Sequence, residues 1–102
     1  MAKVLIADEH EAIRLGVREM LKGVPDLVIA AEASDARQIM ELVAAKKIEV
    51  VIMGLWFPAG SGLAVLRDLK RAHPGTKVLV YTAVSEDELG VRTIRVARMA
   101  TC

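Results

Sequence analysis

The sequence predicts a single doubly wound α/β domain built on a parallel sheet. Short apolar runs alternate with longer segments whose apolar residues recur at helical spacing, and the connections between them are short. The chain has 102 residues, a length that suits one domain. Strand and helix units that repeat in this way form an open parallel sheet with helices on both faces.

Four short apolar runs are the predicted strands of this sheet. A short apolar run bounded by turn residues is typical of a strand that is buried on both faces. The runs are KVLIA, LVIAA, VVIM and KVLVYT, at residues 3–7, 27–31, 50–53 and 77–82. Because each run is followed by a helical pattern, the four strands are expected to run parallel.

Three helices are predicted between these strands. The first spans 11–23, with its apolar residues at helical spacing and its basic residues on the other face. Ser34 is the expected N-cap of the second helix, and Ser61 that of the third. The third helix is expected to end near Pro74, because proline disfavours a helical conformation in the residue before it.

A fourth helix is predicted at the carboxyl terminus. Ser85 and Glu88 form a capping-box pattern that opens it, and its apolar side would carry Val91 and Ile94. The sequence ends at Cys102, about where a fifth strand would begin. We therefore expect a sheet truncated after the fourth βα unit, in a single domain over 1–102 with no output domain.

Composition excludes several classes of function. The net charge of +1 predicts neither nucleic acid nor an anionic membrane as a partner. The single cysteine excludes an internal disulfide and suits a reducing cytoplasm. The amino-terminal apolar run is too short for a signal peptide or a membrane span. The expected location is therefore the cytoplasm.

Polar residues follow the first predicted strand, at the edge where open parallel sheets bind ligands. Asp8, Glu9 and His10 are adjacent there. Two neighbouring carboxylates suit a divalent cation, because Mg²⁺ prefers hard oxygen ligands. They also suit a solvated loop before a helix, where negative charge is favourable. The spacing alone leaves both interpretations open.

The third and fourth predicted strands end differently from the first. Gly54 ends the third strand, so the position best placed for chemistry has no side chain. Trp56 and Phe57 follow it, and loop packing is the commoner role for such residues. Thr82 ends the fourth strand and offers a hydroxyl that suits a hydrogen bond to a phosphoryl oxygen.

These motifs resemble response-regulator receiver domains of two-component phosphorelay signalling, in particular the NarL/FixJ type. The resemblance covers nearly the whole chain. It includes the acid pair followed by His10, the loop from Pro58 to Gly62, the His73-Pro74 turn and the Thr82-Ala83 strand end. It implies a flavodoxin-like (CheY-like) fold with strand order 2-1-3-4-5, a signalling role rather than an enzymatic one, and a sensor histidine kinase or other signalling protein as partner.

The resemblance also implies roles for the strand-end residues. Asp8 and Glu9 would bind Mg²⁺ together with the backbone carbonyl of Trp56, and Thr82 would be the switch hydroxyl. The phosphoacceptor aspartate of the family falls at Gly54, which has no carboxylate to act as a nucleophile. The family's lysine falls beyond the end of this sequence. These implications predict a weak Mg²⁺ site and no phosphorylation at position 54.

A receiver-like domain that acts through protein–protein contacts is the predicted function. One alternative is a truncated or degenerate receiver fragment that folds by self-association. A remoter alternative is a flavodoxin-like cofactor binder, which the acidic loop disfavours because it would repel a phosphate. A homo-oligomer is also predicted, because the fourth strand would be an unpaired edge. The expected interface residues are Lys77, Val78, Leu79, Val80, Val91 and Ile94.

Overall fold

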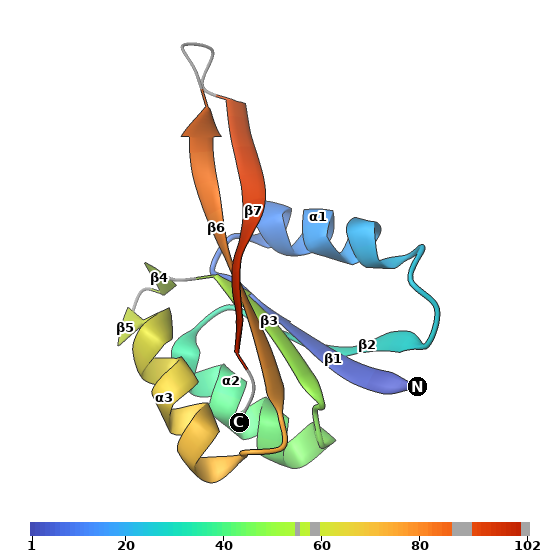
Figure 1. The fold of residues 1–102 in the computed structure, drawn as a ribbon, viewed down its shortest axis with the longest axis vertical. Coiled ribbons are helices and arrows are strands. Elements are labelled where there is room, and N and C mark those ends of the chain that lie inside the picture. The colour runs from blue at the N-terminus through green and yellow to red at the C-terminus, as the bar shows by residue number, and fades with distance from the viewer. Residues whose placement is uncertain (55, 58–59, 87–90, 101–102) are drawn as a thin grey trace.

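A five-stranded sheet organises the fold (Figure 1). The computed structural model describes residues 1–54, 56–57, 60–86 and 91–100. The strands of this sheet are β1 (Ala2–Ala7), β2 (Leu27–Ala33), β3 (Val50–Gly54), β6 (Lys77–Glu86) and β7 (Val91–Ala100). They lie in the order β2-β1-β3-β6-β7, and the first four are parallel. The four predicted strands and their order are therefore confirmed.

Helices cover both faces of the parallel part of the sheet (Figure 1). They are α1 (Glu11–Leu21), α2 (Ala36–Lys46) and α3 (Gly62–Ala72). A small antiparallel pair, β4 (Trp56–Phe57) and β5 (Gly60–Ser61), lies between β3 and α3 in the chain. The first three predicted helices are thus confirmed, each within about two residues of its expected start.

Two hydrophobic clusters fill the two sides of the sheet. Successive side chains of a strand point to opposite faces, and β1 divides its residues in this way. Leu5 and Ala7 belong to the larger cluster, which includes residues of α2 and α3. Val4 and Ile6 belong to the smaller cluster, which includes Val17 of α1. Burial on both faces explains why the parallel strands are continuous apolar runs.

The cap of α2 lies one residue later than predicted. Asp35, not Ser34, is the N-cap, and its carboxylate accepts a hydrogen bond from the backbone N–H of Gln38 at 2.9 Å. The backbone N–H of Ser34 instead donates to Oε1 of Gln38 at 2.8 Å. Aspartate and serine are comparable N-caps, so the adjacent pair left the boundary ambiguous. Ser61 precedes α3 directly, and its side chain lies outside the described part of the structure.

The prediction of a fourth helix is wrong. The strand β6 continues to Glu86, and the segment Val91–Ala100 is the antiparallel strand β7 that pairs with it. Four β-branched residues, Val91, Thr93, Ile94 and Val96, favour an extended backbone there. The capping-box residue Glu88 and Cys102 lie outside the described residues.

The predicted free edge at the fourth strand is therefore also wrong. Residues Val78–Glu86 pair with β7 of the same chain, and Val78 and Val80 are buried in the core. Of the other residues named for an interface, Lys77 is exposed, Leu79 is partly buried, and Val91 and Ile94 belong to β7. The strand pairing removes the reason for expecting a second chain at this edge.

The hairpin of β6 and β7 has an inner and an outer half. Lys77–Tyr81 pairs with β3 on one side and, from Val78 onward, with β7 on the other. Beyond Tyr81, the strand β6 pairs only with β7. In Figure 1 this outer half extends past the ends of the other strands.

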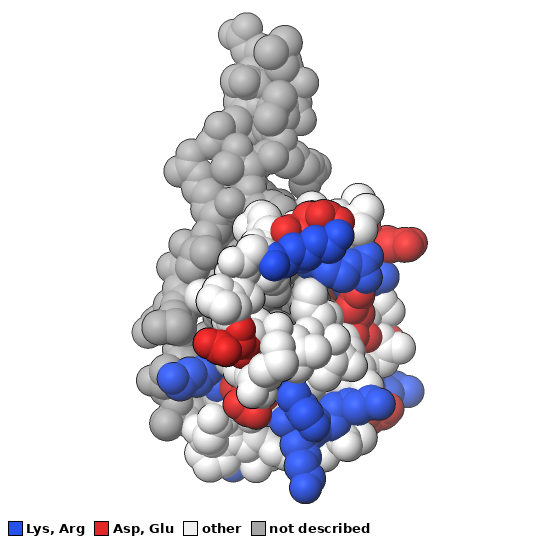
Figure 2. All heavy atoms as spheres, turned by 90° about the vertical axis from the view of Figure 1, so that its right-hand side faces the viewer, with Lys and Arg blue, Asp and Glu red and all other residues white. Residues whose placement is uncertain are grey.

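The surface carries charges of both signs. Figure 2 shows Lys and Arg side chains close to Asp and Glu side chains on the face that it presents. One exposed example is the ion pair, at 2.9 Å, between Glu19 of α1 and Lys22, the residue that follows this helix. This mixture agrees with the net charge of +1 for the whole chain. None of the helices in the described residues has the length and apolarity needed to span a bilayer.

Candidate strand-end acid site

A buried carboxylate lies at the carboxyl end of β1. Asp8 follows the last residue of this strand and is only 8% exposed. Its Oδ1 accepts a hydrogen bond from the backbone N–H of His10 at 2.8 Å, and Nδ1 of the same histidine lies 3.2 Å away. An aspartate that accepts from the amide two residues later stabilises a tight turn. Asp8 thereby fixes the turn into α1, whose N-cap is His10.

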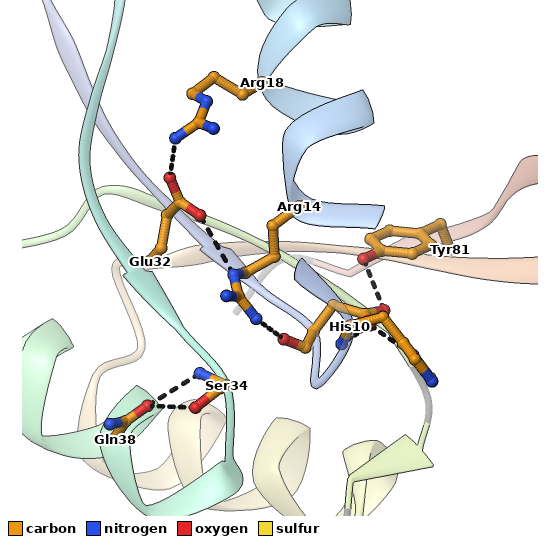
Figure 3. Close-up of polar contacts among 8 residues, drawn as sticks. His10, Arg14, Arg18, Glu32, Ser34, Gln38 and Tyr81 are labelled. Atoms are coloured by element: carbon orange, nitrogen blue, oxygen red, sulfur yellow. Dashed lines mark hydrogen bonds and ion pairs between the residues drawn. The ribbon is translucent and has the colours of Figure 1, made fainter. Parts of the chain in front are cut away.

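The second oxygen of Asp8 contacts a residue that the sequence did not single out. The hydroxyl of Tyr81 on β6 donates a hydrogen bond to Oδ2 at 2.8 Å. Figure 3 shows the ring of Tyr81 above the loop that carries His10. The ring is buried in the smaller hydrophobic cluster. A tyrosine within an apolar strand usually packs in the core, and its buried hydroxyl then needs a hydrogen-bond partner. That requirement is the sequence signal that could have pointed to Tyr81 as part of this site.

Burial and this hydrogen bond keep the tyrosine protonated. Burial raises the pKa of the Tyr81 hydroxyl far above its ordinary value of 10.0, and the hydrogen bond to Asp8 and the charge of that carboxylate raise it further. The positive charge of Arg14 opposes the increase without reversing it. The hydroxyl is consequently a hydrogen-bond donor at neutral and mildly alkaline pH.

Gly54 lies at the end of β3, between Asp8 and Tyr81. In the register of the sheet, Gly54 pairs with Tyr81, and the preceding Met53 pairs with Ala7. A Cβ atom at position 54 would lie 2.7 Å from Oδ2 of Asp8 and 3.7 Å from Cε2 of Tyr81. The first distance is too short for a carbon and an oxygen that are not bonded. The carboxylate of Asp8 therefore occupies the space that a side chain at 54 would take.

Two arginines of α1 and a glutamate of β2 support the acid loop from outside. Nη1 of Arg14 donates to the backbone carbonyl of Asp8 at 2.6 Å, and its Nε donates to Oε1 of Glu32 at 3.1 Å. Arg18 donates to the other carboxylate oxygen of Glu32. Figure 3 shows these contacts as one chain from α1 through β2 to the loop after β1. The loop position is thus tied to both neighbouring elements.

The other residues predicted for this site are less closely gathered. Glu9 is exposed, and its Oε1 lies 3.6 Å from Nε2 of His10. Trp56 belongs to β4 and Thr82 follows Tyr81 in β6, but their side chains lie outside the described residues. Phe57 is buried in the larger cluster, which supports the packing role expected for it.

The described residues show no assembled site for a divalent cation. Both oxygens of Asp8 already accept hydrogen bonds from protein donors, and Gly54 offers no side-chain oxygen. Within the described ranges, no three His, Cys, Asp or Glu side chains gather in a way that could hold a metal ion. Mg²⁺ usually takes one or two carboxylates together with water, and here the two hydrogen bonds orient the only buried carboxylate among the described residues toward protein donors. The weak Mg²⁺ site remains a prediction.

The fold and the strand-end acid define a class of protein. A parallel sheet of order 2-1-3-4, with helices on both faces and an acid at the end of its first strand, is the architecture of flavodoxin-like, CheY-like domains. The family of response regulator receiver domains matches residues 4–100. The chain therefore belongs to this family, which works in two-component signalling, and it is a signalling domain rather than an enzyme, as the sequence predicted.

The curated relatives are response regulators that are longer than this chain. Response regulator GacA of Pseudomonas syringae pv. syringae is 30% identical over 95 residues, which are 93% of this chain and 44% of that protein. The DNA-binding transcriptional activator DevR/DosR of Mycobacterium tuberculosis is 32% identical over 88 residues, or 86% of this chain and 41% of that protein. The chain thus spans less than half the length of these NarL/FixJ-type relatives.

Solved structures give the same fold. The isolated REC domain of RcsB from Salmonella enterica serovar Typhimurium, with the phosphomimetic BeF3−, superposes with a TM-score of 0.76 at 24% identity. That match covers 83% of this chain and 64% of the other. An RcsB–DNA complex gives 0.74 at 25% identity, covering 79% of this chain and 42% of the other. The likeness establishes the CheY-like fold.

Proposed function

We propose that this receiver domain does not accept a phosphoryl group at position 54 and that it acts through contacts with other proteins. The observation that supports the proposal is that β3 ends in Gly54, which has no side chain. Phosphoryl transfer to a receiver needs a carboxylate nucleophile, and Gly54 has no side chain to supply one. The nearest carboxylate, that of Asp8, is buried and hydrogen-bonded at both oxygens, so it is a poor substitute.

The remaining residues keep their receiver roles in this proposal. Asp8 and Glu9 form a weak Mg²⁺ site with the backbone carbonyl of Trp56, and Thr82 is the switch hydroxyl. Receiver domains work with histidine kinases, and a sensor kinase or another signalling protein in the cytoplasm is the proposed partner. The chain acts as one receiver-like domain, and direct contact with nucleic acid is not part of its role.

The alternatives have less support. Self-association through β6 is not favoured, because β7 already pairs with that strand; any homo-oligomer would use another surface. Cofactor binding of the flavodoxin type is not favoured either, since the loop after β1 carries the buried carboxylate of Asp8 rather than donors for a phosphate. The receiver interpretation is the one that agrees with both the family and the strand ends.

Incubation with a small-molecule phosphodonor and Mg²⁺, followed by intact mass measurement, tests the proposal. We expect no phosphoryl adduct on this chain, whereas a receiver domain with an aspartate at the end of its third strand should gain one under the same conditions. That second protein is the control for donor activity. A stable adduct that maps to Asp8 or Glu9 would overturn the proposal.

A further inference from the structure

We propose that Tyr81 and Gly54 together withhold Asp8 from divalent cations. The hydroxyl of Tyr81 holds the carboxylate across the end of β3, and the absence of a side chain at Gly54 makes room for it. This inference rests on the proposed role of Asp8 as a metal ligand of the receiver. It makes Tyr81 a positioning residue that sets the metal affinity of the site.

The first step is the path of the Asp8 side chain. β3 lies between β1 and β6 in the sheet, so a carboxylate at the end of β1 must cross the end of β3 to contact Tyr81. The hydrogen bond of 2.8 Å shows that it does so. A Cβ atom at position 54 would stand 2.7 Å from Oδ2, in the way of this crossing. A side chain at position 54 would therefore have to shift the carboxylate from this path, and glycine leaves the path open.

The hydroxyl of Tyr81, which donates this hydrogen bond, has a fixed position. Tyr81 is 3% exposed, and its ring belongs to a cluster with residues of β1, β3 and α1. That packing prevents the hydroxyl from following the carboxylate if the carboxylate turns toward solvent. If the carboxylate turned outward to a cation, the hydroxyl of Tyr81 would stay buried without its acceptor, and an unsatisfied buried donor is costly.

The third step is the competition at the carboxylate. A hydrogen bond to an ionised acceptor is stronger than one between neutral groups, and the hydroxyl of Tyr81 donates one to Oδ2 of Asp8 at 2.8 Å. The backbone N–H of His10 holds the other oxygen at 2.8 Å. Each carboxylate oxygen has two lone pairs, so a cation competes with these donors for the direction in which the carboxylate faces rather than for a single acceptor site. Removal of a hydrogen bond of this kind changes an equilibrium constant by about tenfold to a hundredfold.

Titration of the whole chain with Mn²⁺ by calorimetry tests the inference. Tyr81→Phe keeps the ring in its cluster and removes only the hydroxyl. The matched control is Thr76→Val, which removes another buried hydroxyl, one that donates to the carbonyl of Ile48 at 3.2 Å before β6 begins. We expect wild type and Thr76→Val to show no saturable binding at micromolar Mn²⁺. Tyr81→Phe should bind at least about tenfold more tightly, and adding Asp8→Asn should abolish the gain.

A second variant keeps the test decisive if Tyr81→Phe does not fold. Gly54→Ala places a methyl group against Oδ2 and pushes the carboxylate off Tyr81, so it should also raise the Mn²⁺ affinity. Saturable binding by wild type at micromolar Mn²⁺ would overturn the inference, as would folded variants that bind no more tightly than wild type. The phosphodonor experiment is independent, because a wild type that binds Mn²⁺ tightly but takes no phosphoryl group would refute only the role of Tyr81.

Discussion

The carboxyl ends of β1 and β3 are neighbours in the sheet, and they differ in the side chains that they place there. β1 ends in Asp8, a buried carboxylate whose two oxygens accept hydrogen bonds from His10 and Tyr81. β3 ends in Gly54, which contributes only backbone. The two positions are nevertheless not independent, because the side chain of the first fills the space left by the second.

The difference shows that a missing side chain can be a structural requirement of its neighbours. With glycine at 54, the carboxylate of Asp8 passes the end of β3 and accepts a hydrogen bond from Tyr81 on β6. A Cβ atom at 54 would stand 2.7 Å from Oδ2 of Asp8, so any side chain there would force the carboxylate to shift. Substitutions at Asp8 and at Gly54 therefore separate the structural role of the Asp8 carboxylate from the role of the space at Gly54.

Removal of the carboxylate should have the largest effect on stability. Asp8→Ala leaves the hydroxyl of Tyr81 and the backbone N–H of His10 without their acceptor, and we expect the free energy of unfolding to fall by about 3 kcal/mol. Asp8→Asn keeps one acceptor oxygen and should lose about half as much. Urea denaturation followed by circular dichroism gives both values. A loss below about 1 kcal/mol for Asp8→Ala would mean that the carboxylate does not join the strands.

Introduction of a side chain at the bare strand end should have the next largest effect. Gly54→Asp brings a second carboxylate against Oδ2 of Asp8, where sterics and like charge both oppose it. We expect a loss of about 2 kcal/mol in metal-free buffer. Gly16→Ala is the control, because a Cβ there meets nothing within 4 Å and alanine favours the helix by about 0.5–1 kcal/mol. We expect Gly54→Asp to lower the free energy of unfolding and Gly16→Ala to raise it. A change of the same sign for both variants would contradict the crowding at position 54.

Loss of the tyrosine hydroxyl should have the smallest effect of the three. Tyr81→Phe removes one hydrogen bond to a charged acceptor, and a loss of about 1.5 kcal/mol is expected. Combined with Gly54→Ala it forms a double-mutant cycle. The methyl group at 54 already displaces the carboxylate, so the double variant should be more stable than the sum of the single losses indicates. Strict additivity would show that positions 54 and 81 do not share Asp8.

The parallel part of the fold was predictable from the sequence because its signals are local. Each strand is a short apolar run between turn residues, and each helix has apolar positions at helical spacing. The closeness of Asp8 and Gly54 also follows from their places at the ends of adjacent parallel strands. The contact of Asp8 with Tyr81 does not follow, because it depends on a side chain that crosses an intervening strand.

The carboxyl-terminal hairpin could not be predicted from spacing alone. Val91 and Ile94 fall three residues apart, which suits one face of a helix, yet the same segment is rich in β-branched residues. The pairing with β6 favours the strand, because it satisfies the backbone groups along the edge of that strand. That gain is tertiary, so no local pattern reports it.

The alkaline titration of Tyr81 is the most direct test of the hydrogen bond between Tyr81 and Asp8 across the end of β3. Tyr81 is the only tyrosine in the chain, so the near-ultraviolet absorbance of tyrosinate reports on it alone. Its pKa is raised in the folded state, so above its ordinary value of 10.0 the unfolded state loses the proton first. Stability should then fall as the pH rises, by up to about 1.4 kcal/mol per pH unit.

The expected result is a native chain without tyrosinate absorbance above that ordinary value, with the signal and the loss of circular dichroism appearing together. A reversible tyrosinate titration near pH 10.0 in a chain that keeps its native spectrum would contradict this. It would show that the hydroxyl of Tyr81 is free of Asp8 and that the carboxylate does not lie across the end of β3.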